Sequence, residues 1–171
     1  ECIMPNQTAN IRIYSTCTSL KDASLLDNIL FTDDQNIIHS EQNAEGSTEE
    51  FEFYLEGTVS QSSKLYRLRY REAEGSGMED TTTLIQFYIE NPKSITLIRQ
   101  GSVSSTMLFE PHKRNLSTYK TPLGPLEICT FTSHIENTLH LDGHLRLDYC
   151  IEVKGLTMES NHLEIDIFPQ A

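Results

Sequence analysis

The alternation of apolar and charged side chains from residue 49 onward constrains the fold of this sequence most. Apolar residues alternate with glutamates over residues 50–56 and with arginines over residues 66–71. Successive side chains of a β-strand point to opposite faces, so a period of two is the pattern of a half-buried strand. These two segments are therefore expected to be strands, and their rows of glutamate and arginine are suited to cross-strand pairing.

Short segments of the same kind recur along the rest of the chain, separated by turn residues. Pro122 and Gly124 mark one such turn, because proline presets φ and glycine accepts a positive φ. Together with a first strand over residues 9–16, about eleven short strands are expected, the pattern of an all-β sandwich or barrel. The further strands are Thr81–Glu90, Ser94–Arg99, Ser104–Phe109, Arg114–Thr121, Leu126–Ser133, Ile135–His140, Leu145–Val153 and His162–Phe168.

The segment between the first two strands breaks the period of two. Apolar residues over Ser19–Phe31 recur at helical spacing after a serine able to cap, which predicts a short amphipathic helix. Residues 32–46 are polar and acidic and are interpreted as a loop. We expect one barrel domain over residues 1–171, with a core over 49–168, the helix and acidic loop over 19–46, and at most about one-sixth helix.

The charge of the chain is strongly and unevenly negative. The formal net charge is −12, and residues 1–60 carry eleven acids against two bases, a balance of −9. An acidic domain repels a phosphate backbone, so nucleic acid is not an expected partner. The charge alone identifies no protein partner.

The four cysteines form no CxxC pair and no zinc-ligand spacing. Free thiols in a cytoplasmic protein are the simplest interpretation, and Cys129 and Cys150 are predicted on different faces of their strands. The sequence has no secretory h-region and no apolar run near membrane-spanning length, so neither export nor membrane insertion is expected. Met4 is the expected natural start.

Arg99 is the first candidate for ligand binding, because it shares a strand face with Ile95 and Leu97. An inward arginine is costly unless it is paired or binds a ligand, and its planar fork suits a carboxylate. The plainer interpretation is that Arg99 ends its strand in solvent or on an internal glutamate. Arg99→Met is expected to keep the fold intact. Buried phenols also seek hydrogen-bond partners, and the tyrosines expected at the interior or its mouth are Tyr66, Tyr70 and Tyr119.

No catalytic group, cofactor site or metal site is predicted. His140 and His144 flank a Leu-Asp-Gly stretch that allows two hairpin registers. A three-residue loop places the two imidazoles opposite each other, and a two-residue turn places them on opposite faces. Metal binding needs further ligands that no recognisable spacing supplies. The basic run His112–Arg114 is either an anion site or simply solvated.

Several ordered motifs resemble a bacterial family of YwiB-like proteins over about residues 54–167. The resemblance implies a closed antiparallel barrel of the calycin (lipocalin-like) kind, in cytosolic proteins without an assigned activity. The residues that carry it are Gly77–Leu84, Thr96–Val103, Phe109–Pro111 with Lys113–Arg114, Thr121–Glu127 and Leu145–Tyr149.

Three functions of different classes remain open. The first is a small-molecule binder that holds an amphiphilic or anionic ligand inside the barrel, on Arg99, with its tail against Phe51, Phe53 and Leu68 and the predicted helix as a lid. The second is an interaction module with a barrel filled by side chains. The third is an enzyme that uses Glu79 or Asp80 at the barrel rim, although no catalytic constellation supports it.

Overall fold

A computed structural model describes residues 5–19, 47–154 and 156–170. All regular structure in this part of the chain is β-strand, and no membrane-length apolar helix occurs among these residues. The strands are β1 (Gln7–Ser19), β2 (Thr48–Gln61), β3 (Leu65–Arg71), β4 (Thr82–Tyr88), β5 (Ile95–Gln100), β6 (Ser105–Phe109), β7 (Arg114–Thr121), β8 (Gly124–Asn137), β9 (His144–Val153) and β10 (Leu156–Pro169).

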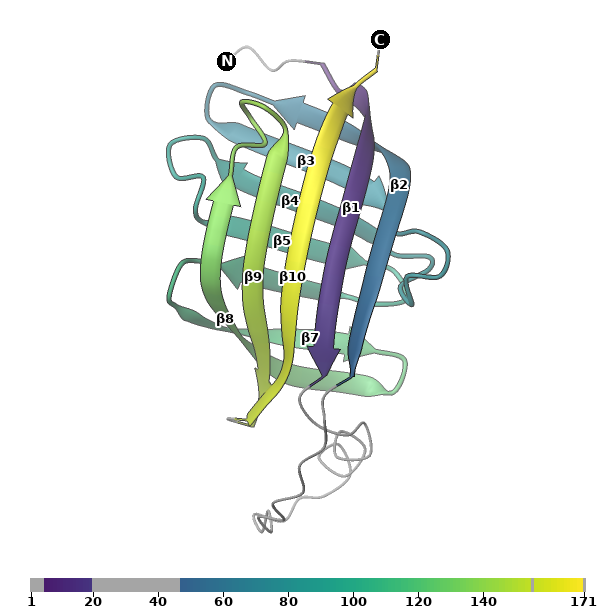
Figure 1. The fold of residues 1–171 in the computed structure, drawn as a ribbon, viewed down its shortest axis with the longest axis vertical. Helices are drawn as coiled ribbons and strands as arrows, with labels where there is room; N and C mark the ends of the chain where they lie inside the picture. Colours follow the sequence, from purple (N-terminus) through teal and green to yellow (C-terminus); the bar gives the residue numbers. More distant parts are fainter. Residues whose placement is uncertain (1–4, 20–46, 155, 171) are drawn as a thin grey trace.

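The ten strands form one antiparallel sheet in the order β6-β5-β4-β3-β2-β1-β10-β9-β8-β7. The sheet curls until its two edge strands meet at Ser104 and Lys120, whose backbones exchange hydrogen bonds of 3.1 and 2.8 Å. Figure 1 shows the long strands β8, β9, β10 and β1 lying over the shorter strands β3 to β5, which cross behind them. The result is a nearly closed antiparallel barrel, which is one of the two architectures, sandwich or barrel, that the strand pattern predicts.

β2 belongs to both halves of the barrel. It pairs with β1 along most of its length and then with β3 from Gly57 to Gln61. A Cβ on Gly57 would lie 2.2 Å from the Ile11 side chain and 2.9 Å from the Arg69 carbonyl oxygen. Glycine at this position therefore permits the close approach of three strands.

The core consists of the inward residues of the alternating pattern. Ile11, Leu68, Ile85, Phe109 and Ile165 are each 1% exposed or less. These side chains come from five strands of the sheet. They pack against one another in one core and fill that part of the barrel interior.

Two predicted element boundaries change. The segments predicted as Leu126–Ser133 and Ile135–His140 form the single strand β8, with an irregularity in its register between Thr132 and His134. The predicted helix was placed from Ser19, but Ser19 is the last residue of β1. The rest of that helix and the acidic loop lie outside the described residues.

The predicted pairing of glutamate and arginine rows between β2 and β3 is wrong. The glutamates of β2 lie opposite β1, where Glu52 is the partner of Tyr14 and forms an ion pair with Arg12. The arginines of β3 lie opposite the last residues of β2, including Thr58, and opposite β4. The two charged rows occupy separate parts of the sheet because β2 is long enough to pair with its two neighbours in turn.

Candidate functional site

A cavity of about 470 Å³ lies inside the barrel. Its wall combines the second half of β1, the beginning of β2, the end of β9 and the beginning of β10 with residues of the β3–β4 loop. Most of the wall is apolar, and the Phe51 and Phe53 rings stack at 6.2 Å between centroids. Other apolar lining residues include Ile13, Met107, Leu126, Ile128, Ile151 and Leu163.

Arg99 points into this cavity from β5, as predicted from its strand face. Its Nε atom lies 3.8 Å from a carboxylate oxygen of Glu72, and the two side chains are 15% and 8% exposed. This ion pair is longer than a hydrogen bond, and the buried Nε finds no hydrogen-bond partner among the described residues. Glu72 also accepts a hydrogen bond of 2.5 Å from Thr83. The carboxylate of Glu72 therefore balances the charge of the Arg99 guanidinium, but the Nε–H group can still donate a hydrogen bond.

Three tyrosines surround this arginine, two of them predicted. Tyr70, Tyr119 and Tyr149 all line the cavity. Burial raises the pKa of Tyr149 to about 12, and the pKa values of Tyr70 and Tyr119 are also raised, first by burial. All three phenols thus stay protonated near neutral pH and can donate hydrogen bonds.

Tyr66 and Leu68 do not belong to the site, contrary to the prediction from sequence. Tyr66 is 2% exposed and its ring stacks on Phe87 at 5.1 Å between centroids. Leu68 is fully buried in the core. Their side chains point to the same inner face of β3 as that of Tyr70, but they lie further along the strand from the cavity.

A second polar group of the cavity wall comes from β1 and β10. The Cys17 thiol donates to Glu159 at 3.4 Å, and the Asn161 amide donates to the other carboxylate oxygen at 3.2 Å. Burial and the Glu159 charge raise the pKa of Cys17 to about 12, so the thiol is a neutral donor and not a nucleophile.

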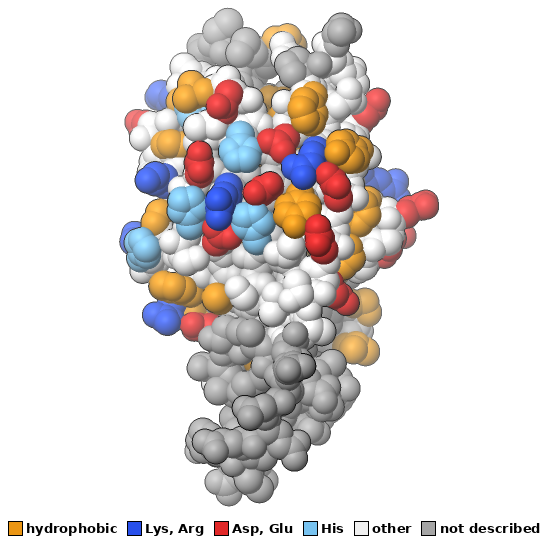
Figure 2. Space-filling model, viewed as in Figure 1, with side chains coloured by type: hydrophobic (Ala, Val, Ile, Leu, Met, Phe, Trp, Pro, Cys, Tyr) orange, Lys and Arg blue, Asp and Glu red, His pale blue; other side chains and the backbone are white. Residues whose placement is uncertain are grey.

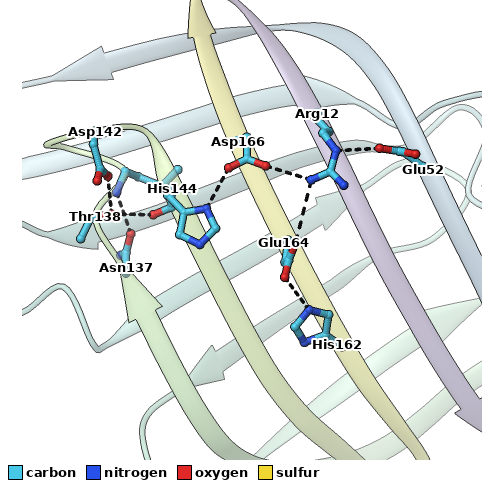
Figure 3. A network of polar contacts seen from close by, with 10 residues as sticks. Arg12, Glu52, Asn137, Thr138, Asp142, His144, His162, Glu164 and Asp166 are labelled. Carbon is cyan, nitrogen blue, oxygen red and sulfur yellow. Dashed lines mark hydrogen bonds and ion pairs between the residues drawn. The ribbon is translucent and has the colours of Figure 1, made fainter.

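The outer face of the same strands carries a network of charges (Figures 2 and 3). Arg12 on β1 lies 2.6 Å from Glu52, 2.9 Å from Asp166 and 3.8 Å from Glu164. His144 Nδ1 lies 2.8 Å from Asp166. This network joins four neighbouring strands on a solvent-facing surface, and we interpret it as structural.

His162 extends this network. Its Nδ1 lies 2.5 Å from Asp148 and its Nε2 lies 3.0 Å from Glu164. A neutral imidazole has one N–H donor, so two bonds to carboxylates require the protonated ring. Burial opposes that charge, but the two carboxylates outweigh it and raise the pKa of His162.

The hairpin between β8 and β9 has neither of the two predicted registers. The amides of Leu141, Asp142 and Gly143 all donate to the Thr138 carbonyl, so the loop covers residues 138–143. His140 packs against Phe87, at 5.7 Å between ring centroids, and does not face His144. The described residues include no cluster of His, Cys, Asp or Glu suited to a metal ion.

The other polar candidates are engaged within the chain. Lys113 forms an ion pair with Glu110, and Arg114 forms one with Glu152, each at 3.2 Å. Glu79 accepts hydrogen bonds from the amides of the β3–β4 loop, and its neighbour Asp80 forms an ion pair with Arg71 at 2.7 Å. The contacts of Lys113, Glu79 and Asp80 organise turns, and that of Arg114 joins β7 to β9.

The described cysteines Cys17, Cys129 and Cys150 are free. The prediction that Cys129 and Cys150 lie on different faces is wrong. Cys129 is opposite Glu152, and Cys150 is opposite Phe131, so the two thiols are diagonal neighbours on one face.

Glu72, Tyr149 and Glu159 are cavity residues that sequence reasoning missed. Glu72 follows the inward-facing Tyr70 by two residues, and Tyr149 follows the inward-facing Leu147 by two residues. The alternation of side chains along a strand could therefore have predicted both. Glu159 carried no such signal, because residues 156–162 show no apolar alternation and the pairing with β9 is irregular between Thr157 and Glu159.

The fold and its cavity define a class of protein: a nearly closed, ten-stranded antiparallel barrel with a buried arginine facing an internal cavity. The chain belongs to the family described as a domain of unknown function, DUF1934, which matches residues 37–165. The crystal structure of the ywiB protein from Bacillus subtilis is similar, with a TM-score of 0.61 and 18% identity over 94% of this chain and 92% of that chain. These findings confirm the YwiB-like resemblance and show the fold. None of the curated proteins matches the chain.

Proposed function

We propose that this protein binds a small amphiphilic molecule inside its barrel. The ligand's headgroup accepts hydrogen bonds from Arg99 and the surrounding tyrosines, and its tail lies against Phe51 and Phe53. The observation that carries the proposal is the buried Arg99 guanidinium, which faces a cavity of about 470 Å³ and whose Nε has no hydrogen-bond partner among the residues that the structure describes.

The energetic case rests on the cost of an unmet donor. A buried donor without a partner costs about 1–3 kcal/mol, and a ligand acceptor at Arg99 removes that cost. The volume falls in the range of about 300–1,000 Å³ typical of small-molecule sites, and a mostly apolar wall with a few polar groups is also typical.

We further infer that the barrel is of the calycin kind and that the protein acts in the cytoplasm as a binder. The support for a binder is that Cys17, which lines the cavity, is held as a neutral thiol beside Glu159 and is therefore not activated as a nucleophile.

The test is the uptake of a fluorescent fatty-acid analogue, 11-(dansylamino)undecanoic acid, followed by its emission. The wild type should bind the probe. Leu126→Trp fills the cavity and should weaken binding at least about tenfold, whereas Glu127→Trp on the exposed side of the same strand should leave it unchanged. Arg99→Met should weaken binding about tenfold, because a charge-assisted hydrogen bond is worth about 1.5–3 kcal/mol.

The outcomes separate the candidate functions. Failure of the wild type to take up any amphiphile would overturn the proposal in favour of an interaction module with a filled barrel. Equal binding by the wild type and Leu126→Trp would place the probe outside the cavity and would also overturn it.

A further inference from the structure

The cavity has a second acidic side chain besides Glu72, namely Glu159 on the β10 side. Its hydrogen bonds from Cys17 and Asn161 come from neutral donors. Arg99, by contrast, already has the carboxylate of Glu72 at 3.8 Å. His162 also borders the cavity, but its ring nitrogens are bonded to Asp148 and Glu164 on the outer face. The described cavity wall therefore directs two carboxylates and one guanidinium inward.

Arg99 and Glu159 line the same cavity, together with Tyr119 and Tyr149. The pKa of Tyr149 is set first by burial, and then Arg99 lowers it and Glu159 raises it. The pKa of Tyr119 responds to the same two charges in the same directions. A positive and a negative group of the protein are thus within electrostatic reach of one bound headgroup.

On the basis of the proposed function, we infer that the ligand is a zwitterionic amphiphile, with an anionic group on Arg99 and a cationic nitrogen on Glu159. Glu72, Arg99, the ligand's anion, its cation and Glu159 then form a row of alternating charge. Asn161 and Cys17 hold the Glu159 carboxylate in place at the end of this row.

Singly charged headgroups fit the same cavity less well. A simple anion meets Arg99 but adds a third negative charge to an interior where charges are poorly screened. A simple cation pairs with Glu159 but leaves the Arg99 Nε without an acceptor. A zwitterion satisfies both groups and leaves the net charge of the cavity unchanged.

The test compares probes of nearly equal chain length that differ in headgroup, each used below its micelle-forming concentration. The probes are N-dodecyl-β-alanine (zwitterionic), dodecanoate (anionic), dodecylamine (cationic) and dodecyl maltoside (uncharged), and each competes against the bound fluorescent probe. We expect N-dodecyl-β-alanine to bind at least about tenfold more tightly than each of the other three probes, as one additional charge-assisted contact implies.

Glu159→Gln removes the charge with little change of shape. It should lower the affinity for N-dodecyl-β-alanine about tenfold and reduce its preference over dodecanoate to near parity. Glu127→Gln, which removes an exposed acid on β8, should change neither value. The panel on the wild type is decisive by itself if Glu159→Gln does not fold.

Failure of this inference is distinguishable from failure of the proposed function. If dodecyl probes enter the cavity but dodecanoate or dodecylamine equals the zwitterion, the inference is overturned and the proposed function stands. An unchanged preference in folded Glu159→Gln also overturns it. If no dodecyl probe binds, both fail together.

Discussion

At the scale of single residues, the charge of Arg99 is coupled to that of Glu72 inside the barrel. The Glu72 side chain is 8% exposed, and Arg99 is its cation at 3.8 Å. Removing one member of a buried pair leaves the other uncompensated, whereas replacing both members can be nearly neutral. We therefore still expect Arg99→Met to keep the fold intact, but the buried pair implies a cost in stability.

Arg99→Met alone should lower the free energy of unfolding by about 1–3 kcal/mol, because it leaves the Glu72 carboxylate buried without a cation. The double variant Arg99→Met with Glu72→Gln should regain most of that loss. Urea unfolding of the wild type, both single variants and the double variant measures the coupling. If the losses in free energy of unfolding of the two single variants add up to that of the double variant, the ion pair does not contribute to stability.

His162 should make stability depend on pH in a definite direction. Its folded pKa is raised above the ordinary value of 6.5. The stabilisation of the folded state by protonated His162 is therefore complete below about pH 6.5, and it is lost as the pH rises through the folded pKa. When the pH rises from about 5.5 to about 8.5, the free energy of unfolding of the wild type should fall by about 0.5–1.5 kcal/mol more than that of His162→Gln. His134→Gln is the matched control, because the half-exposed His134 has only a 4.0 Å contact with Glu136.

Denaturant unfolding at the two pH values measures this difference. The ring of His162 contacts Asp148 on β9 and Glu164 on β10, and it lies 6.2 Å from the ring of Tyr14 on β1, centroid to centroid. A wild type and a His162→Gln variant with the same pH dependence would show that the imidazolium contributes nothing to stability.

At the scale of elements, the period of two predicted most of the strands but not their irregularities. β3, β5 and β7 match their predicted positions within a residue or two, because each keeps one parity from end to end. β8 was divided in two, because the irregularity near Ser133 moves the inward positions from Thr130 and Thr132 to Ile135. A single sequence cannot distinguish such a shift of parity from the end of a strand.

The pairing of β8 with β9 also gives a prediction for the cysteines. All four thiols should be reactive in a titration under denaturing conditions without reductant. Diagonal neighbours on adjacent strands are about 7–8 Å apart, beyond the usual reach of a disulfide, so Cys129 and Cys150 should stay reduced despite sharing a face. Two or fewer reactive thiols would show a bridge and contradict this geometry.

At the scale of the whole molecule, the barrel was predictable and the contents of its cavity only partly so. Arg99, Tyr70 and Tyr119 were placed correctly in the interior by strand parity. Tyr66 has the same parity yet lies in the core, because the distance of a residue from the cavity depends on strand tilt and length. These quantities follow from how ten strands close on one another, and local pattern does not contain them.

The position of β1 has a consequence for how this chain is made. β1 pairs with β2 on one side and with β10, the last strand of the sequence, on the other. While the ribosome is still making the chain, one edge of β1 has no partner, and the barrel cannot close until β10 has emerged. An unpaired strand edge is a template for association with other chains, and pairing between distant segments is slow. The nascent protein should therefore be most prone to aggregate in the interval before β10 emerges from the ribosome and pairs with β1.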